Sequence, residues 1–570
     1  MPDPETDSEQ LSGDASCSSR TSHTSEGVKM MRRVRQGLFV FVATIGFQAA
    51  ASHAATAPSA LYLFDELSGT IVTDSVGSND GSLITPANVT QGTGGVFGTA
   101  YNFVSDSASG GINLGNSSII QPNDDFTITM WINPSSLDSF DRIIESMGGS
   151  ASTDQGLRLD LGGAPGDSAR VLIRDGTGAS ATIQHSLNMS TNQWYFVAVR
   201  FDKDAASDQL QLSVLDQVDA PTAANINNGT SGTNIAASIQ TNGILYEAGL
   251  DTTVASKGAS GTVETSNGYN GHIDDLAFYS SVLTNDQLNF VRRFGAQTVM
   301  PTIGWDAEDT SSTTASSWAS NIDDGTPRTW NLSGDADTPA LVDVSGPSEF
   351  RIDKAYQFVG NTGFATSSSP LPNRGDDVSI ELYIKPTDLT GQEVVFEAGG
   401  DANGFSILLD GDQLKLRYDN DSVSDLAGAN FLQVAHTLTA ADITDFIQVV
   451  AEIDLGNDLI ELFVNGESVG AIATANAGTA AGNIGSWGGG NNDALGSGTA
   501  YSASDIGGDD GADLDSFRAF DGLIGVVRFY SGTLLSDDQV LGNYQAMLVP
   551  EPASMSLLLI GTMGLLRRRR

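Results

Sequence analysis

Alternation of apolar and polar residues is the main signal along this chain, and its clearest stretch occurs twice. Residues 124–134 read Asp-Asp-Phe-Thr-Ile-Thr-Met-Trp-Ile-Asn-Pro, and residues 376–386 read Asp-Asp-Val-Ser-Ile-Glu-Leu-Tyr-Ile-Lys-Pro. Both stretches begin with two aspartates, alternate through a strand and end at a proline. The same offset relates Trp194 to Phe446. This repetition predicts two copies of one β-rich domain.

Between these stretches lie many short apolar runs separated by Gly, Asp and Asn turns, which is the spacing of a sandwich or jelly roll. The chain has 64 glycines and an apolar fraction of 40%, enough for two packed cores. Each copy closes on a strand followed by Ser or Thr three residues before Gln, at Thr284 and Gln287 and again at Ser536 and Gln539. This is a capping box and predicts a short helix after the last strand of each copy.

A length of 570 residues suits two such domains with additional segments at the ends. Arg32, Arg33 and Arg35 precede an apolar run at residues 37–51 and small residues that fit a cleavage site, which predicts a secretory signal peptide. The predicted organisation is a disordered or non-native extension at 1–29, a signal peptide at 30–57, jelly rolls at 58–297 and 298–548, and an apolar sorting segment at 549–570.

The formal net charge of −43 makes nucleic acid an improbable partner, because phosphate backbones are repelled by an acidic surface. The same charge favours hard cations such as Ca²⁺, and solubility in salty water is the alternative explanation. The single cysteine, Cys17, lies before the predicted mature start. The exported part therefore has neither a disulfide nor a thiolate metal site.

Three stretches of the first copy resemble laminin-G-like, concanavalin A-like jelly-roll domains. They are Leu-Phe-Asp-Glu and the turns after it (residues 63–77), the Asp-Asp-Phe-Thr-Ile-x-x-Trp-Ile-x-Pro strand, and the closing Gly-x-Ile-Asp-Asp-Leu-x-Phe-Tyr (residues 271–279). The second copy keeps the central and closing strands but opens differently. The resemblance implies an all-β fold of two tandem jelly-roll sandwiches, and it implies little about the ligand.

The C-terminal segment resembles the PEP-CTERM sorting signal of Gram-negative bacteria. It consists of Pro550, Glu551 and Pro552, an apolar run to Leu566, and four arginines. As a helix, the run would reach only about 21 Å, short of a roughly 30 Å hydrocarbon core. The resemblance implies transient insertion in the inner membrane, cleavage by an exosortase-type enzyme, and release or attachment at the cell surface.

Four aspartates are candidate ligands of one calcium ion. Asp65, Asp74 and Asp80 lie in turns of the opening segment, and Asp274 lies on the closing strand, which can neighbour the first strand in such folds. Solvated turn aspartates are the alternative. The second copy lacks Asp274 and has instead a Gly-rich loop with four aspartates (residues 509–515), which we interpret as a second site or as a flexible acidic loop.

Exposed loop aromatics would suit a ligand platform, and Trp487 and Tyr501 are the candidates. The strand patterns predict instead that Trp131, Trp194, Tyr101 and Tyr356 belong to the cores.

Catalytic carboxylates at alternate strand positions are approached only at Glu452-Ile-Asp454, where the third acid is missing. Glu145 and Glu397 match each other and are interpreted as isolated strand-end acids. We expect no catalytic residue.

These patterns predict an exported, non-catalytic cell-surface or matrix protein that binds a polysaccharide or a surface glycoprotein in adhesion or biofilm. One alternative is an envelope module that binds protein without recognising sugar. Another is a divergent glycoside hydrolase of the concanavalin A-like type.

Overall fold

The computed structural model describes residues 57–548 with gaps. The gaps are 105–109, 149–153, 163–166, 217–228, 257, 260–261, 264–266, 310–316, 333–338, 345–347, 360–363, 366–370, 373, 401–402, 420–431, 474–483, 485–486, 488–492 and 497–517. The predicted signal peptide, Tyr501, the acidic loop at 509–515 and the sorting segment at 549–570 therefore lie outside the described residues.

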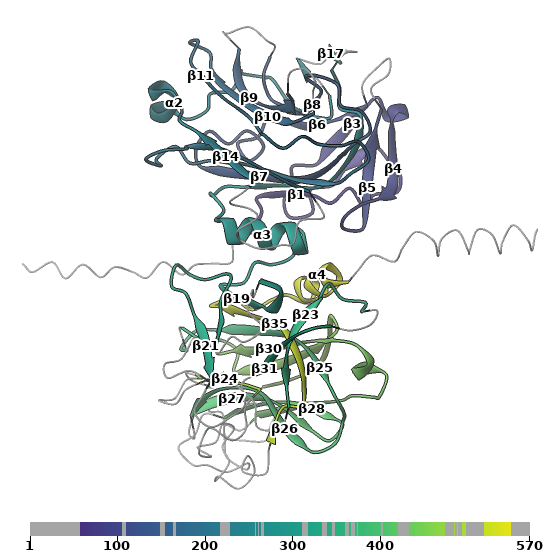
Figure 1. The fold of residues 1–570 in the computed structure, drawn as a ribbon, viewed down its shortest axis with the longest axis vertical. Coiled ribbons are helices and arrows are strands. Elements are labelled where there is room, and N and C mark those ends of the chain that lie inside the picture. Colours follow the sequence, from purple (N-terminus) through teal and green to yellow (C-terminus); the bar gives the residue numbers. More distant parts are fainter. Residues whose placement is uncertain are drawn as a thin grey trace, which may run out of the picture. The chain divides into compact units, whose positions relative to one another are not determined.

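The strands of the first domain form two eight-stranded antiparallel sheets (Figure 1). Sheet A has the order β14-β13-β12-β7-β18-β5-β4, with β1 paired to β18, and sheet B has the order β11-β10-β9-β8-β15-β6-β3-β2. The strands are β1 (Ala60–Tyr62), β2 (Ile71–Val72), β3 (Gly81–Ile84), β4 (Val89–Gly94), β5 (Thr99–Phe103), β6 (Gly111–Gly115), β7 (Phe126–Pro134), β8 (Arg142–Glu145), β9 (Gln155–Leu161), β10 (Ala169–Asp175), β11 (Ser180–Gln184), β12 (Tyr195–Phe201), β13 (Leu210–Asp216), β14 (Thr230–Thr233), β15 (Thr252–Val254) and β18 (Gly271–Tyr279), with β16 (Gly258–Ala259) and β17 (Thr262–Val263) as a separate hairpin.

The second domain repeats this plan. Sheet C has the order β22-β23-β35-β25-β30-β31-β32 with β19 beside β35, and sheet D has the order β20-β21-β24-β33-β26-β27-β28-β29 with β34 beside β26. The strands are β19 (Ile303–Asp306), β20 (Ser317–Ala319), β21 (Thr329–Leu332), β22 (Ala340–Asp343), β23 (Lys354–Phe358), β24 (Phe364–Ala365), β25 (Val378–Pro386), β26 (Gln392–Gly400), β27 (Asn403–Asp410), β28 (Gln413–Asp419), β29 (Leu432–Thr437), β30 (Ile447–Asp454), β31 (Leu459–Val464), β32 (Glu467–Ala473), β33 (Ala494–Leu495), β34 (Arg518–Ala519) and β35 (Gly522–Ser531).

The duplicated stretch forms the equivalent central strand in both copies, so the predicted repeat is confirmed. β7 lies between β12 and β18, and β25 lies between β30 and β35. In β7 the alternate residues Ile128, Met130 and Ile132 enter the apolar core between sheets A and B. The equivalent residues of β25 enter a separate core between sheets C and D. The protein is nearly all-β, as the alternation predicts.

Both capping boxes are present, as predicted. Thr284 starts α3 (Asn285–Phe294) and Ser536 starts α4 (Asp537–Met547), each with reciprocal bonds to the Gln three residues on. Helix α3 lies beyond the outer face of sheet A in Figure 1, and its apolar residues Leu288 and Phe290 belong to one cluster with Trp131 of β7. The remaining helical segments are short: α2 (Ala237–Asn242), η1 (Pro86–Asn88), η2 (Ala307–Asp309) and η3 (Asp442–Thr444).

No helix in the described part of the chain is long and apolar enough to cross a membrane.

Candidate functional site

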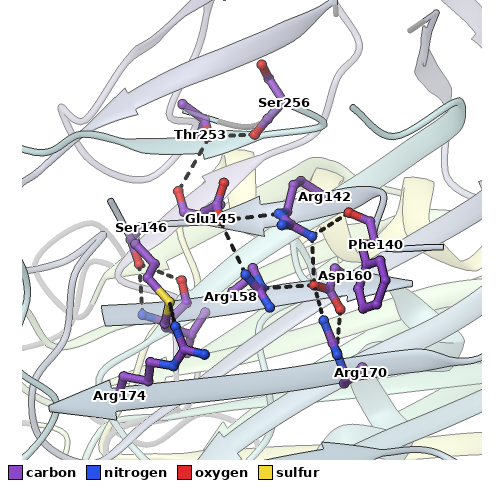
Figure 2. A network of polar contacts seen from close by, with 12 residues as sticks. Phe140, Arg142, Glu145, Ser146, Arg158, Asp160, Arg170, Arg174, Thr253 and Ser256 are labelled. Atoms are coloured by element: carbon purple, nitrogen blue, oxygen red, sulfur yellow. Dashed lines mark hydrogen bonds and ion pairs between the residues drawn. The ribbon is translucent and has the colours of Figure 1, made fainter. Parts of the chain in front are cut away.

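A network of charged side chains lies on the outer face of sheet B, where strands β8, β9 and β10 run side by side (Figure 2). Strand β9 alternates: Leu157, Leu159 and Leu161 enter the core, whereas Arg158 and Asp160 point to the opposite face. The register brings acids and bases of neighbouring strands together. Glu145 lies opposite Arg158, and Asp160 lies opposite Arg170.

Asp160 is the centre of the network. One carboxylate oxygen lies 2.9 Å from Nη1 of Arg142 and 2.8 Å from Nε of Arg158. Arg170 binds both oxygens with two parallel hydrogen bonds of 2.8 Å, a bidentate geometry that fixes the guanidinium plane. Glu145 completes the network, with Oε1 3.2 Å from Nε of Arg142.

The network is almost entirely buried. Asp160 and Glu145 are 0% exposed and Arg142 is 4% exposed. Burial and the neighbouring Arg142 lower the pKa of Arg158 from its ordinary value. Burial also raises the pKa of Asp141, which precedes β8, to about 7, with Asp138 adding repulsion. A buried network whose members are all paired makes this part of the sheet rigid. Removing one member would leave its partner buried and unpaired.

An exposed aromatic side chain lies over this network. The Phe140 ring is centred 4.8 Å from the Arg170 guanidinium carbon, and its backbone oxygen accepts a hydrogen bond from Arg142 (Figure 2). The residue is 40% exposed and its φ of 71° lies in the left-handed region, which a bulky side chain rarely adopts. Strain of this kind persists only where the surroundings hold it, and it clusters at binding sites.

Two exposed polar residues of β11 lie beside this network. Gln184 of β11 lies opposite Arg170, and Thr182 lies opposite Leu172. Both Gln184 and Thr182 are exposed. We call Phe140, Arg170, Thr182 and Gln184 the sheet-B face. It presents an aromatic ring, a fixed guanidinium, an amide and a hydroxyl, which can hydrogen-bond to hydroxyl groups and pack against a ring.

The interpretation of Glu145 as an isolated strand-end acid is wrong. Arg158 and Asp160 are visible in the sequence as alternate charges on one strand, but the cross-strand register that joins them to Glu145 is not. In the second domain, Glu397 lies opposite Ser406, and Arg417 comes one strand later. Both Glu397 and Arg417 are buried. The second copy therefore keeps the glutamate but not the arginine cluster.

The four candidate calcium ligands separate into two places. Asp74 accepts hydrogen bonds from the backbone N–H groups of Leu61, Gly77 and Asn79, and Asp80 accepts one from Asp74 itself. This is a hydrogen-bonded turn, in which the Asp74 carboxylate is occupied by amides.

Asp65 and Asp274 do come together, at the turn between β4 and β5. Asp65 accepts from Thr99 N at 2.6 Å, and Asp274 Oδ2 accepts from Val96 N at 2.7 Å and Phe97 N at 3.0 Å. Among the described residues, no three His, Cys, Asp or Glu side chains lie close enough together to hold a metal ion. The prediction of one site built by all four aspartates is therefore wrong.

Trp487 is in the core and is not on an exposed loop. Its side chain is 0% exposed, its indole N–H donates to Asp376 O at 3.0 Å, and its ring packs against Phe405 and Phe529. The flanking glycines misled the prediction, because the Trp487 side chain itself is part of the apolar core. Trp131, Tyr101 and Tyr356 are buried as predicted, whereas Trp194 is partly exposed.

Glu452 and Asp454, the residues that come nearest to a catalytic carboxylate pattern, both hold neighbouring loops by hydrogen bonds. Glu452 accepts hydrogen bonds from Ser379 Oγ at 2.6 Å and Leu535 N at 2.8 Å, and burial raises its pKa to about 7. Asp454 accepts two hydrogen bonds from Asn457 in the following turn.

The chain belongs to the concanavalin A-like lectin/glucanases superfamily, whose laminin-G model matches residues 106–214 and 358–540. The protein is a tandem of two such modules with a PEP-CTERM protein-sorting motif, which matches residues 548–570. The motif implies export and membrane-associated processing by an exosortase-type enzyme. No curated protein matches the chain.

Several solved structures are similar to this chain. Domains LG4-5 of the mouse laminin alpha1 chain are 11% identical, with 76% of this chain and 92% of that chain covered and a TM-score of 0.24. Domain 4 of AbnA, a GH43 extracellular arabinanase from Geobacillus stearothermophilus, is 17% identical, with 42% and 99% covered and a TM-score of 0.29. The CBM40 of Ruminococcus gnavus IT-sialidase is 17% identical, with 33% and 94% covered and a TM-score of 0.24. Likenesses this weak carry no argument about function.

Proposed function

We propose that the protein is an exported carbohydrate-binding protein of the cell surface or extracellular matrix, acting in adhesion or biofilm without catalysis. The observation that carries the proposal is Phe140, an exposed aromatic residue in a strained backbone conformation, seated over Arg170 beside a polar sheet face. An aromatic ring beside fixed hydrogen-bonding groups suits a molecule that has both an apolar ring face and hydroxyl groups.

The surroundings of Glu145, Asp160 and Glu452 favour binding over bond cleavage. A glycoside hydrolase needs two carboxyl groups on either side of an open site, one to donate a proton and one to attack or to activate water. Glu145 and Asp160 are both fully buried and paired with arginines. Glu452 is bonded to Ser379 and to a backbone amide. These contacts support a non-catalytic role.

The sorting motif supports a surface location. We propose that residues 30–57 direct export and that the segment from Pro550 inserts transiently in the inner membrane before an exosortase-type enzyme cleaves it. The partner at the surface would be a polysaccharide or a surface glycoprotein.

The test is binding of the purified protein to a panel of neutral and acidic polysaccharides, by affinity gel electrophoresis, with release of reducing sugar followed in parallel. We expect retardation by at least one polysaccharide and no reducing-sugar release. Phe140→Ala should weaken binding on the sheet-B face by about tenfold, since one stacked aromatic contributes on the order of 1 kcal/mol or more. Ile71→Ala is the matched control, because Ile71 is 61% exposed at the far edge of the same sheet.

The two alternatives predict different results. Retention of envelope proteins with no polysaccharide retardation would favour a protein-binding module and overturn the proposal. Release of reducing sugar from any polysaccharide of the panel would favour the glycoside hydrolase.

A further inference from the structure

The central strands of both domains carry apolar side chains that do not belong to the core of their own domain. In sheet A, Trp131 of β7 lies opposite Phe196 of β12, and in sheet C, Tyr383 of β25 lies opposite Val526 of β35. All four belong to an apolar cluster that is separate from the two domain cores, and all four are at most 2% exposed. The outer face of an antiparallel sheet is commonly polar and in contact with water, so these apolar faces have to be covered.

The cluster that covers them is shared by the two domains. The core of each domain contains residues of that domain only, whereas the shared cluster takes residues from both. Both domains belong to one compact unit that begins at Ser52. We call the shared cluster the junction, and besides the four residues above it includes Val96, Phe97, Phe290 and Phe294 of the first domain and Phe350, Ile352 and Met547 of the second.

Arg528 of β35 is buried against helix α3 of the first domain. Its guanidinium carbon lies 5.0 Å from the centre of the Phe290 ring and 4.6 Å from the centre of the Phe294 ring. Within its own domain, Arg528 Nη1 donates a hydrogen bond of 3.1 Å to Glu381 Oε2. Arg528 is 1% exposed. A buried arginine has to be paired and shielded from water, and here the second domain supplies the acid while the first domain supplies the aromatic cover.

Two further arginines make contacts from one domain to the other. Arg293 of α3 donates from Nη1 to Oδ2 of Asp306, the last residue of β19, at 2.6 Å. In the opposite direction, Arg351 of the second domain donates from Nη2 to Val96 O at 2.8 Å, and its guanidinium carbon lies 4.7 Å from the centre of the Phe97 ring. These polar contacts have directions, so they fix how the two apolar faces meet.

Arg351 also binds the end of the second domain. Its Nε donates to Leu548 O at 3.3 Å, and its backbone N–H donates to Met547 O at 2.7 Å. Leu548 is the last described residue before the sorting segment. One arginine side chain therefore joins the turn between β4 and β5 of the first domain to the point where the sorting segment leaves the second.

We propose that the junction makes the two domains a single cooperative unit, which unfolds as a whole rather than domain by domain. Neighbouring domains of one chain move independently unless their interface is large and hydrophobic. Separation here would expose the apolar outer faces of sheets A and C together and would remove the aromatic cover of Arg528, and both changes raise the free energy of the separated state. The proposal does not depend on carbohydrate binding.

Hydrogen exchange of the full-length protein in increasing urea, measured by mass spectrometry, tests the proposal because it follows each domain separately in one sample. Peptides from β9 report on the first domain, and peptides from β27 report on the second. We expect both sets of peptides to lose protection at the same urea midpoint.

The double variant Arg293→Ala/Arg351→Ala removes contacts across the junction and leaves the core of each domain unchanged. We expect it to split the single transition into two midpoints, with the less stable domain opening first. Lys415→Ala is the matched control, because Lys415 forms an ion pair of 2.6 Å with Asp410 inside sheet D and not at the junction. We expect this control to keep one shared midpoint.

Two milder variants test the contact itself if the double variant does not fold. Phe97→Leu keeps an apolar side chain but removes the ring, and Arg351→Lys keeps the charge but removes the planar guanidinium that lies over that ring. Each variant alone already removes the contact between the two domains. We therefore expect the combined variant to lower the urea midpoint by less than the sum of the two single shifts.

Three results would overturn the proposal. The first is two separate midpoints in the natural protein, because each domain would then open alone. The second is a shared midpoint that Arg293→Ala/Arg351→Ala leaves unsplit, since two independent domains of equal stability would behave in that way. The third is additive shifts for Phe97→Leu and Arg351→Lys, which would show that the two side chains do not act together.

Discussion

Aspartates in the opening turns of this protein bind backbone amides. The carboxylate of Asp74 accepts five hydrogen bonds, from Leu61 N, Val76 N and Gly77 N on one oxygen and from the backbone and side chain of Asn79 on the other. Burial acts to raise the pKa of Asp74, but the hydrogen bonds outweigh it and hold the pKa below the ordinary value. A carboxylate bonded in this way holds the turn in its conformation.

Replacing Asp74 should destabilise the first domain. Asp74→Ala leaves the buried Leu61 amide without its acceptor, and we expect a loss of about 2–3 kcal/mol in the free energy of unfolding, measured with urea. Asp74→Asn keeps one acceptor oxygen and should lose less. Because the folded-state pKa is depressed, the contribution is present above about pH 4 and is lost as the pH falls through the folded-state pKa. Equal stability of the two variants would contradict this role.

Glu452 should give stability the opposite pH dependence. Burial raises the pKa of Glu452 to about 7, whereas a glutamate in the unfolded chain has a pKa of about 4.3. Between these values the folded state holds a proton that the unfolded state has released, so the free energy of unfolding falls as the pH rises, by up to about 1.4 kcal/mol per pH unit.

Glu452→Gln should flatten that dependence between about pH 4.5 and pH 7, measured by urea unfolding at several pH values. Asp454→Asn on the same strand is the control, because Asp454 is held by the following turn. An unchanged pH profile in Glu452→Gln would show that Glu452 is not the titrating group.

At the scale of elements, the helix that follows the last strand of each copy begins in the same way. In α3, Thr284 Oγ1 accepts from Gln287 N at 3.2 Å while Gln287 Oε1 accepts from Thr284 N at 2.8 Å. In α4, Ser536 and Gln539 make the same pair of bonds. Both boxes use side chains within one turn, which is why they are visible in the sequence.

Thr284→Ala should cost about 1 kcal/mol of stability, since the first amides of α3 lose their acceptor. Thr284→Ser keeps the hydroxyl group and should be close to neutral, and Ser536→Ala provides the same test in the second domain. The measurement is urea unfolding of each variant. A loss in Thr284→Ser as large as in Thr284→Ala would mean that the threonine methyl group matters more than the cap.

At the scale of the whole molecule, the excess of acid makes calcium binding a prediction that stays open to test. Asp274 and Asp275 are almost completely buried, and each has an Oδ1 atom without a hydrogen-bond partner in the described chain. Burial and mutual repulsion raise the pKa of Asp274, and burial raises the pKa of Asp275 to about 7, with Asp65 adding to both. A cation bound beside Asp65 and Asp274 would remove the free-energy cost of burying these carboxylates in their ionised form.

We therefore expect millimolar Ca²⁺ to raise the midpoint of thermal unfolding by several degrees relative to excess chelator at matched ionic strength, because a ligand of the folded state stabilises it by mass action. Asp274→Asn should abolish the calcium-dependent part of that rise. An identical midpoint with calcium and with chelator would show that the acidic surface serves solubility alone.

Local signals allowed much of the fold to be predicted. The repeated strand, the short alternating runs and the two capping boxes each depend on residues close together in the chain, so the sequence by itself determined the two-copy β architecture and the helix after each copy. The Pro550-Glu551-Pro552 motif was equally visible, because a sorting enzyme reads a linear segment.

Only the tertiary structure decided which distant side chains come together. In the sequence Glu145 looked isolated, but the register of β8 and β9 sets it beside Arg158. Trp487 looked exposed, but its side chain is buried in the core. Asn102, Asn133 and His272 are far apart in the chain and meet only through strand pairing. Strand order and register depend on contacts between distant segments, which the alternation within one strand does not encode.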